Sequence, residues 1–200
     1  MPATHFITDL KREMINAIGP TPTAPASVGT PVPGASSVEG SLPVVVSGSG
    51  GTLTYVASAD ASRCNGNYLY GVDHRITTTE LDARHPVVIT GRYSGCILRV
   101  FRTDPDRYVV MHVYNPGPNS ALPAAADAYV RSRGGKDVVD MGSKGLIGPG
   151  IDSIWWVCEL VPNGMGINVA RLDVGSTGRI VRREIGWNPF GATGIRSRAS

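Results

Sequence analysis

Apolar and polar residues alternate with a period of two along most of the chain after residue 42, and this pattern predicts β-strands. The apolar runs are short, and Gly, Pro, Asp and Asn, which favour turns, separate them. The predicted strands are PVVVS (43–47), TLTYVAS (52–58), NYLYGV (67–72), HPVVITG (85–91), CILRVFR (96–102), RYVVMHVYN (107–115), SIWWVCELV (153–161), GINVARLDV (166–174) and GRIVRREI (178–185). Many short strands of this kind are typical of stacked β-sheets.

Turn residues predict how some of these strands pair. The segment RTDPDR (102–107) places a proline between two Asp residues, so the strands on either side of it should form a hairpin. The last three strands are separated by Asn-Gly at 163–164 and by Ser-Thr-Gly at 176–178. Both are turn sequences, and they predict a meander of three strands.

Two segments have the period of an α-helix instead. The first, residues 4–18, should begin at Thr4 as its cap and end at Gly19. Its apolar face consists of Phe6, Ile7, Leu10, Met14 and Ile18. The second helix, residues 122–135, is rich in Ala and ends at a pair of glycines.

Residues 20–42 follow no period and are rich in Pro, Ser, Thr and Ala, which predicts an extended linker. The predicted organisation is therefore an N-terminal helix (1–19), a linker (20–42) and a β-rich domain (43–200). The predicted fold class is α+β, a β-sandwich of mostly antiparallel or mixed sheets with flanking helices.

Composition narrows the classes of function. The chain has 200 residues, of which 42% are hydrophobic, enough for one domain with an ordinary core. Its 19 Lys and Arg against 16 Asp and Glu give a net charge of +3 without a basic run, so nucleic acid is not an expected partner. No apolar run is long enough to span a membrane. Charged residues in MPATHFITDLKREM stand where a secretory signal needs apolar ones, so classical export is not expected.

The three cysteines are Cys64, Cys96 and Cys158. An odd number, without a CxxC pair or a Cys/His spacing typical of zinc, argues against a disulfide framework and against a structural metal. A bridge between Cys64 and Cys158 is compatible with the sequence and would leave Cys96 as a free thiol.

Cys96 and His112 form the candidate chemical site. Cys96 begins one strand of the predicted hairpin, directly after Ser94-Gly95, and His112 lies within the other strand. A period of two places His112 and Tyr114 on one face, so the thiol and the imidazole should lie close together. Gly95 favours a tight turn, and backbone amides at Ser94 and Gly95 are candidate donors to an oxyanion.

An imidazole beside a thiol can accept its proton and produce a strongly nucleophilic thiolate. The same histidine can return the proton to a departing amine. The alternative is structural, because a strand cysteine is commonly a small buried apolar residue and a strand histidine a hydrogen-bonded core residue. Cys64 in a turn and Cys158 between bulky residues are weaker candidates for a nucleophile.

The segment YSGC, followed by an apolar strand, a polar turn and an apolar strand with MHV, resembles the glutamine deamidases of the cytotoxic necrotizing factor type, in particular their free-standing members. The resemblance covers residues 87–117. It implies that Cys96 is the nucleophile, that His112 is the base and acid, and that Thr90, six positions before the cysteine, orients His112. Tyr93 stands where this family often has leucine.

The resemblance also implies an activity and its partners. A toxin or effector of this type converts a glutamine of a host protein, a Rho-type GTPase or a translation-initiation helicase, to glutamate through a cysteine thioester. In a GTPase, loss of the glutamine that orients the attacking water would keep the protein in its active, GTP-bound state. Neither a metal nor another cofactor is expected. We further expect a monomer that is made in the bacterial cytoplasm and delivered into the host cytoplasm, with residues 43–200 as the deamidase domain.

Two other functions remain open at this stage. One is a non-catalytic β-sandwich effector or binding module, in which Cys96 and His112 are core residues. The other is a chemoreceptor-type glutamine deamidase, although that family usually has Gly-Ser before its cysteine, the reverse of the Ser94-Gly95 order. Transglutamination is also accessible from the same thioester if an amine replaces water.

Overall fold

A computed structural model describes residues 6–22, 40–58, 60–114, 117, 120–161 and 166–187. Strands predominate in it and helices are few. The helices are α1 (Phe6–Lys11), α2 (Leu122–Ser132) and the short 3₁₀ turns η1 (Ser49–Gly51) and η2 (Ala61–Arg63). The strands are β1 (Ala17–Ile18), β2 (Ser41–Ser47), β3 (Thr52–Ala57), β4 (Gly66–Tyr70), β5 (Ile76–Leu81), β6 (Val87–Tyr93), β7 (Ile97–Asp104), β8 (Arg107–Val113), β9 (Lys136–Gly142), β10 (Ser153–Leu160), β11 (Ile167–Val174) and β12 (Ile180–Trp187).

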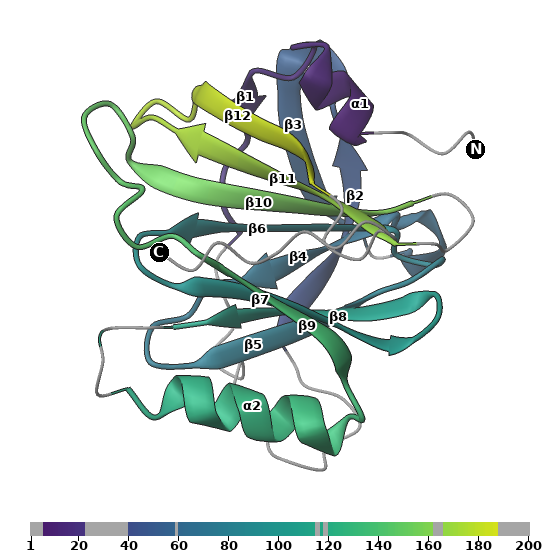
Figure 1. Cartoon of the computed structure of the whole chain (residues 1–200). Coiled ribbons are helices and arrows are strands. Elements are labelled where there is room, and N and C mark those ends of the chain that lie inside the picture. Colours follow the sequence, from purple (N-terminus) through teal and green to yellow (C-terminus); the bar gives the residue numbers. More distant parts are fainter. Residues whose placement is uncertain are drawn as a thin grey trace.

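The strands form two sheets, one above the other in Figure 1. The larger sheet has the order β1-β3-β2-β4-β6-β10-β11-β12, and the smaller has the order β5-β8-β7-β9. The larger sheet curves until its ends meet. The N–H of Ile18 donates to the carbonyl of Gly178, and the N–H of Ile180 donates to the carbonyl of Asn16, both at 2.9 Å. These bonds join β1 to the start of β12.

The predicted fold class is confirmed, because two mixed and antiparallel sheets are packed together with helices outside them (Figure 1). The predicted hairpin is β7–β8, and the predicted meander is β10–β11–β12. The strands β5 and β9 were not predicted. β5 has the sequence ITTTEL, whose buried threonines break the apolar signal, and β9 is largely exposed, so it has little apolar pattern to detect.

The helix predicted over residues 4–18 is wrong beyond Lys11. Residues 17–18 form β1 instead, which pairs with Thr52 and Leu53 of β3. The apolar residues that suggested a longer helical face are used differently, because Ile15 and Ile18 enter the core of the sheet while Met14 is 57% exposed. Strand pairing therefore prevails over the helical period. The predicted cap Thr4 lies outside the described residues.

The predicted linker is corrected at its end, because β2 begins at Ser41 rather than at residue 43. Residues 23–39 lie outside the described part of the chain. Residues 20–22 are described, and they line the pockets that are considered below.

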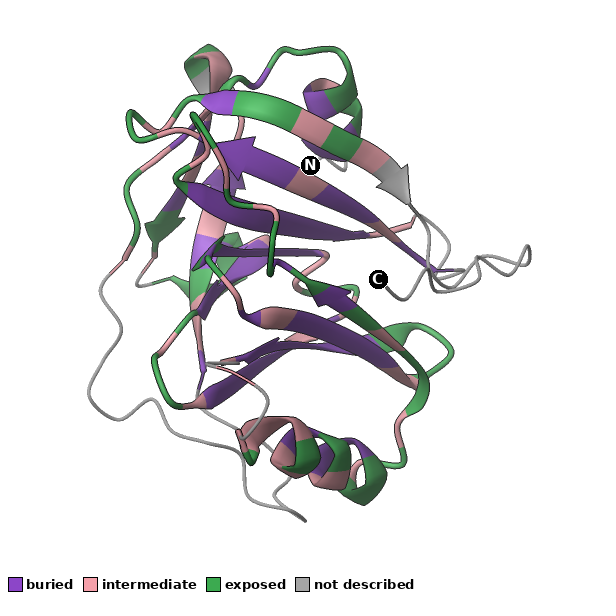
Figure 2. Ribbon diagram, turned by 60° about the vertical axis from the view of Figure 1, so that its left-hand side comes forward, coloured by how far each residue is buried: buried purple, intermediate pink, exposed green. Residues whose placement is uncertain are grey.

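Three apolar clusters hold the layers together, and Figure 2 shows the strands between them as mostly buried. The first lies inside the curve of the larger sheet and includes Phe6 and Leu10 of α1. The second lies between the two sheets and includes Tyr93 and Cys96. The third lies between the smaller sheet and α2 and includes Phe101. Burial of this apolar surface is the main force that holds the layers together.

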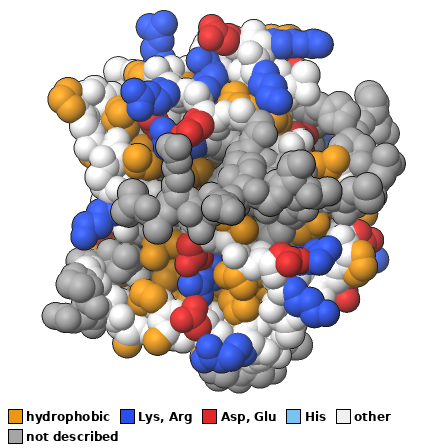
Figure 3. Space-filling model, viewed as in Figure 1, with side chains coloured by type: hydrophobic (Ala, Val, Ile, Leu, Met, Phe, Trp, Pro, Cys, Tyr) orange, Lys and Arg blue, Asp and Glu red, His pale blue; other side chains and the backbone are white. Residues whose placement is uncertain are grey.

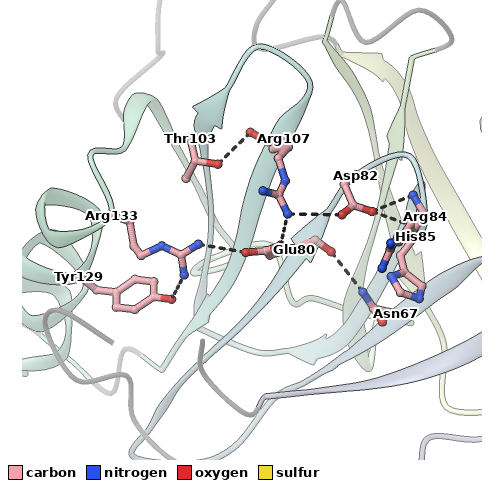
Figure 4. A network of polar contacts seen from close by, with 9 residues as sticks. All are labelled: Asn67, Glu80, Asp82, Arg84, His85, Thr103, Arg107, Tyr129 and Arg133. Atoms are coloured by element: carbon pink, nitrogen blue, oxygen red, sulfur yellow. Dashed lines mark hydrogen bonds and ion pairs between the residues drawn. The ribbon is translucent and has the colours of Figure 1, made fainter. Parts of the chain in front are cut away.

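Ion pairs join α2 to the smaller sheet and the strands of that sheet to one another. Arg99 of β7 binds Asp127 of α2 and Asp140 of β9 at 2.5 and 2.7 Å. Figure 4 shows Glu80 of β5 between Arg107 of β8 and Arg133, at 3.2 and 3.0 Å. These contacts link the four strands of the smaller sheet to one another and to the helix that covers them.

Charged side chains of both signs lie on the face shown in Figure 3, and acidic ones are found among the basic ones. Among the described residues, no helix combines the length and the apolar character needed to cross a membrane.

A buried carboxylate attaches α1 to the larger sheet. Glu159 of β10 is 5% exposed, and its two oxygens accept hydrogen bonds from the N–H groups of Phe6 and Ile7 at 3.0 and 3.1 Å. These amides belong to the first turn of the helix, where an intrahelical acceptor is lacking and negative charge is favourable.

We predict that Glu159→Gln lowers the free energy of unfolding by about 1–2 kcal/mol, because charge-assisted hydrogen bonds to buried amides are lost. Glu184→Gln is the matched control. Glu184 is 67% exposed on β12 and pairs with Arg171, so its loss should cost less than about 1 kcal/mol. Urea unfolding of both variants measures the difference, and equal losses would contradict this role for Glu159.

Candidate active site

The candidate site is a pocket of about 170 Å³ at one end of the sandwich. It lies where β4, β6 and β8 end and β7 begins. Its lining consists of Thr21, Pro22, Tyr68, Tyr70, Gly71, Asp73, Gly91, Arg92, Ser94, Cys96, His112 and Tyr114. Cys96 and His112, which the sequence singled out, therefore face the same pocket.

The register of the β7–β8 hairpin explains this placement. His112 is paired with Leu98, and Ile97 is paired with Val113. Cys96 precedes β7 by one residue, so it is the diagonal neighbour of His112 on the same face of the sheet. Side chains of diagonal neighbours in an antiparallel pair are close enough for long or aromatic groups to touch. The register of the predicted hairpin thus places the two residues on one face of the sheet, at diagonal positions.

His112 is almost completely enclosed, with 2% of its surface exposed. The Tyr93 ring meets the imidazole edge-on, with 4.5 Å between the ring centroids. On the pocket side, a Cβ atom at position 71 would lie 3.3 Å from Cε1 and Nε2 of His112. Because Gly71 has no side chain, it leaves this edge of the ring uncovered. Nδ1 is buried, whereas Nε2 lies on the side of the ring that faces Gly71, a residue of the pocket lining.

The environment of His112 favours the neutral ring. Burial lowers the pKa of His112 from 6.5 to about 4. Among the described residues, its Nδ1 has no hydrogen-bond partner. A neutral imidazole can accept the thiol proton, whereas an imidazolium in this position needs a nearby negative charge to be stable.

Thr90 makes no hydrogen bond to His112, although a direct one was expected of an orienting residue. Its hydroxyl lies 3.2 Å from the hydroxyl of Tyr93, and Thr90 is fully buried. Tyr93 in turn contacts the imidazole, so Thr90 reaches His112 through Tyr93. Burial raises the pKa of Tyr93 well above its usual value, so this hydroxyl stays protonated. Tyr93, the aromatic residue before Ser94, thus lies between the Thr90 hydroxyl and the imidazole of His112.

Gly95 is not available as an oxyanion donor through its amide, which corrects the sequence expectation. Its N–H donates to the hydroxyl of Ser143 at 2.9 Å. The Ser143 hydroxyl in turn donates to the carbonyl of Cys96 at 2.9 Å, and the Ser143 amide donates to the same carbonyl at 3.1 Å. Ser143 is fully buried and fixes the turn that carries the thiol. Ser94 is exposed and lines the pocket, so its hydroxyl faces the available space.

Several pocket residues were missed by the sequence reasoning. Arg92 and Asp73 are exposed and contribute charges of opposite sign. The ring of Tyr114 lines the pocket and lies 4.8 Å from the ring of His74. Arg92 could have been noticed because it stands between Thr90 and Ser94. Ser143 gave no such signal, because it is 47 residues away from Cys96.

The other two cysteines lie apart from this pocket's lining, and none of the three cysteines forms a disulfide, so the bridge between Cys64 and Cys158 is not formed. Cys158 is fully buried, and burial raises its pKa to about 12. Cys64 is as exposed as Cys96, at 8%, and its thiol lies 3.8 Å from the carbonyl of Asp60. Among the described residues, no three His, Cys, Asp or Glu side chains are grouped to hold a metal ion.

No protein-family model matches the chain, and no curated protein matches it.

The lowered pKa of His112 gives a pH-dependent stability. In the unfolded chain the imidazole titrates near 6.5, so between pH 6.5 and about 4 the unfolded state binds more protons than the folded state. Stability is therefore lost as the pH falls through this window. We predict that the wild type loses about 3 kcal/mol more than His112→Gln between about pH 7 and pH 4. Urea unfolding at both pH values tests this, and parallel pH profiles for the two proteins would contradict it.

Proposed function

We propose that the chain is a protein-glutamine deamidase that uses Cys96 as its nucleophile and His112 as base and acid. The observation that carries this proposal is that both side chains face one pocket from adjacent strands of the β7–β8 hairpin. The resemblance of residues 87–117 to deamidases of the cytotoxic necrotizing factor type supports the same assignment. The substrate would be a host protein, a Rho-type GTPase or a translation-initiation helicase, reached after delivery into the host cytoplasm.

The size of the pocket supports a side chain as substrate. Pockets for drug-sized ligands usually occupy about 300–1,000 Å³. A pocket of about 170 Å³ is smaller than this and matches a single extended side chain better than a whole metabolite. A glutamine that projects from the surface of another protein would meet this condition.

In the proposed first half-reaction, the Cys96 sulfur attacks the carboxamide carbon while its proton passes to Nε2 of His112. The Ser94 hydroxyl donates to the oxyanion. The imidazolium then gives its proton to the amide nitrogen, the C–N bond breaks, and ammonia leaves a thioester. The negative charge that forms on the substrate stabilises the imidazolium while it exists.

In the second half-reaction, water attacks the thioester carbon and transfers a proton to Nε2. The C–S bond breaks, the proton returns from the imidazolium to the Cys96 sulfur, and the product is glutamate. The balance is one glutamine and one water for one glutamate and one ammonia. Thr90 acts as a positioning residue through Tyr93, and Ser143 does so by fixing the turn of Cys96.

A non-catalytic binding module is the second candidate. It is favoured by the His112 ring itself, whose Nδ1 has no partner among the described residues and whose pKa is low. A core histidine shows the same properties. In that case Cys96 has no chemical role and contributes only to the apolar cluster between the sheets.

Peptide mass spectrometry of Rho-type GTPases and translation-initiation helicases after incubation with the protein tests the proposal. We predict a Gln-to-Glu mass change at one site that disappears with Cys96→Ser.

His112→Gln should lower the rate by about 10²–10⁴-fold, the usual contribution of a general base. Ser143→Ala should lower kcat roughly tenfold or more, because the nucleophile is displaced.

Two variants serve as controls. Cys64→Ser removes an equally exposed thiol, and Ser132→Ala removes a hydroxyl that bonds to Tyr129 on α2. Both should keep the wild-type rate. Identical spectra for wild type and Cys96→Ser on all these substrates would contradict the deamidase and favour the binding module.

A further inference from the structure

A second pocket, of about 280 Å³, adjoins the candidate site. Its residues come from four places in the chain: the end of β1 with the segment after it, the end of β6, the start of β10, and the end of β11 with the turn before β12. Thr21 and Arg92 line both pockets. The two pockets are therefore neighbouring parts of one depression, with Arg92 at their junction.

Neighbouring residues of β6 and β10 contribute to the two linings, since Gly91 lines the smaller pocket and Trp155 lines the larger one. A Cβ atom at position 91 would lie only 2.2 Å from the Trp155 ring. The ring therefore lies directly against the backbone of β6. The Nε1–H of Trp155 donates to the hydroxyl of Ser153 at 3.2 Å, which fixes the ring. The position of Arg92 is thus set by a rigid part of the larger sheet, even though its side chain is exposed.

Arg92 is a cation without an ion pair among the described residues. Each pocket also has one exposed carboxylate, Asp152 in the larger pocket and Asp73 in the smaller one. Both carboxylates repel an acidic ligand from the remainder of the two pockets. An acidic side chain is therefore favoured at one place, the guanidinium of Arg92 at the junction.

We propose that the two pockets bind one segment of the target polypeptide, with the glutamine in the smaller pocket and an Asp or Glu within two residues of it on Arg92. This inference rests on the proposed deamidase. It makes Arg92 a residue that determines specificity, and it defines the substrate class as glutamines with an acidic neighbour. Extended residues rise about 3.3 Å each, so one or two positions bridge two adjoining pockets.

Binding is tested separately from turnover, with the full chain carrying Cys96→Ala. Fluorescent peptides contain one glutamine and either Asp or Lys at each of the two positions before and after it. We expect the best Asp peptide to bind roughly fivefold more tightly than its Lys counterpart, a typical effect of one exposed ion pair. About 0.5 M NaCl should largely abolish this preference.

Charge reversal provides the decisive comparison. Cys96→Ala/Arg92→Glu should prefer the Lys peptide, whereas Cys96→Ala/Asp152→Asn should bind the Asp peptide more tightly, because a repulsive charge is removed. Cys96→Ala/Arg84→Glu is the matched control, since Arg84 is exposed and lines neither pocket. It should keep the preference of Cys96→Ala.

The outcomes separate the two proposals. A preference that does not change with Arg92→Glu, or no preference at all, overturns the assignment of Arg92 even if wild type deamidates both peptides. A preference that depends on Arg92, without deamidation of any peptide by wild type, supports the acidic-segment site and overturns the deamidase instead.

Discussion

The pairing of β7 with β8 is the interaction on which the candidate site depends. With Leu98 opposite His112, the imidazole and the Cys96 thiol lie on the face that packs against the larger sheet. Strand side chains alternate between faces, so a slip of one residue would turn His112 toward α2 and separate it from the thiol. The register is held by apolar residues on both faces of these strands, in the cluster between the sheets and in the cluster under α2.

The candidate site places polar side chains within the apolar layer between the two sheets, and this burial determines the charge state of the imidazole. His112 is enclosed by Tyr93 and by the sheets, which keeps the ring neutral before a substrate binds. Near neutral pH the ring becomes charged only together with a compensating negative charge, which in the proposed deamidase is the thiolate or the oxyanion. The proposed mechanism therefore couples the proton transfer to the attack. Ser143 and Thr90 contribute by holding the turn and the tyrosine that surround these two groups.

The sequence predicted the fold class and the hairpin because both depend on local patterns. Alternating apolar residues and the turn at 102–107 were sufficient to place Cys96 and His112 on one face of a hairpin, where the structure has them at diagonal positions. β5 and β9 were missed because threonines and exposed positions conceal their period. The N-terminal helix was predicted too long because a helical apolar pattern cannot reveal that residues 17–18 pair with β3. The contacts of Ser143 and the junction position of Arg92 arise from distant segments, which no local pattern reports.

The central claim is that a neutral imidazole activates one thiol of the three, and the rate of alkylation tests it most directly. Cys64 and Cys96 have the same exposed fraction, 8% of each residue, so iodoacetamide compares two cysteines at similarly buried positions. At near-neutral pH we predict that Cys96 is modified at least about tenfold faster than Cys64, and that His112→Gln abolishes this difference. Equal rates at the two thiols, or a fast Cys96 that is unaffected by His112→Gln, would contradict the account.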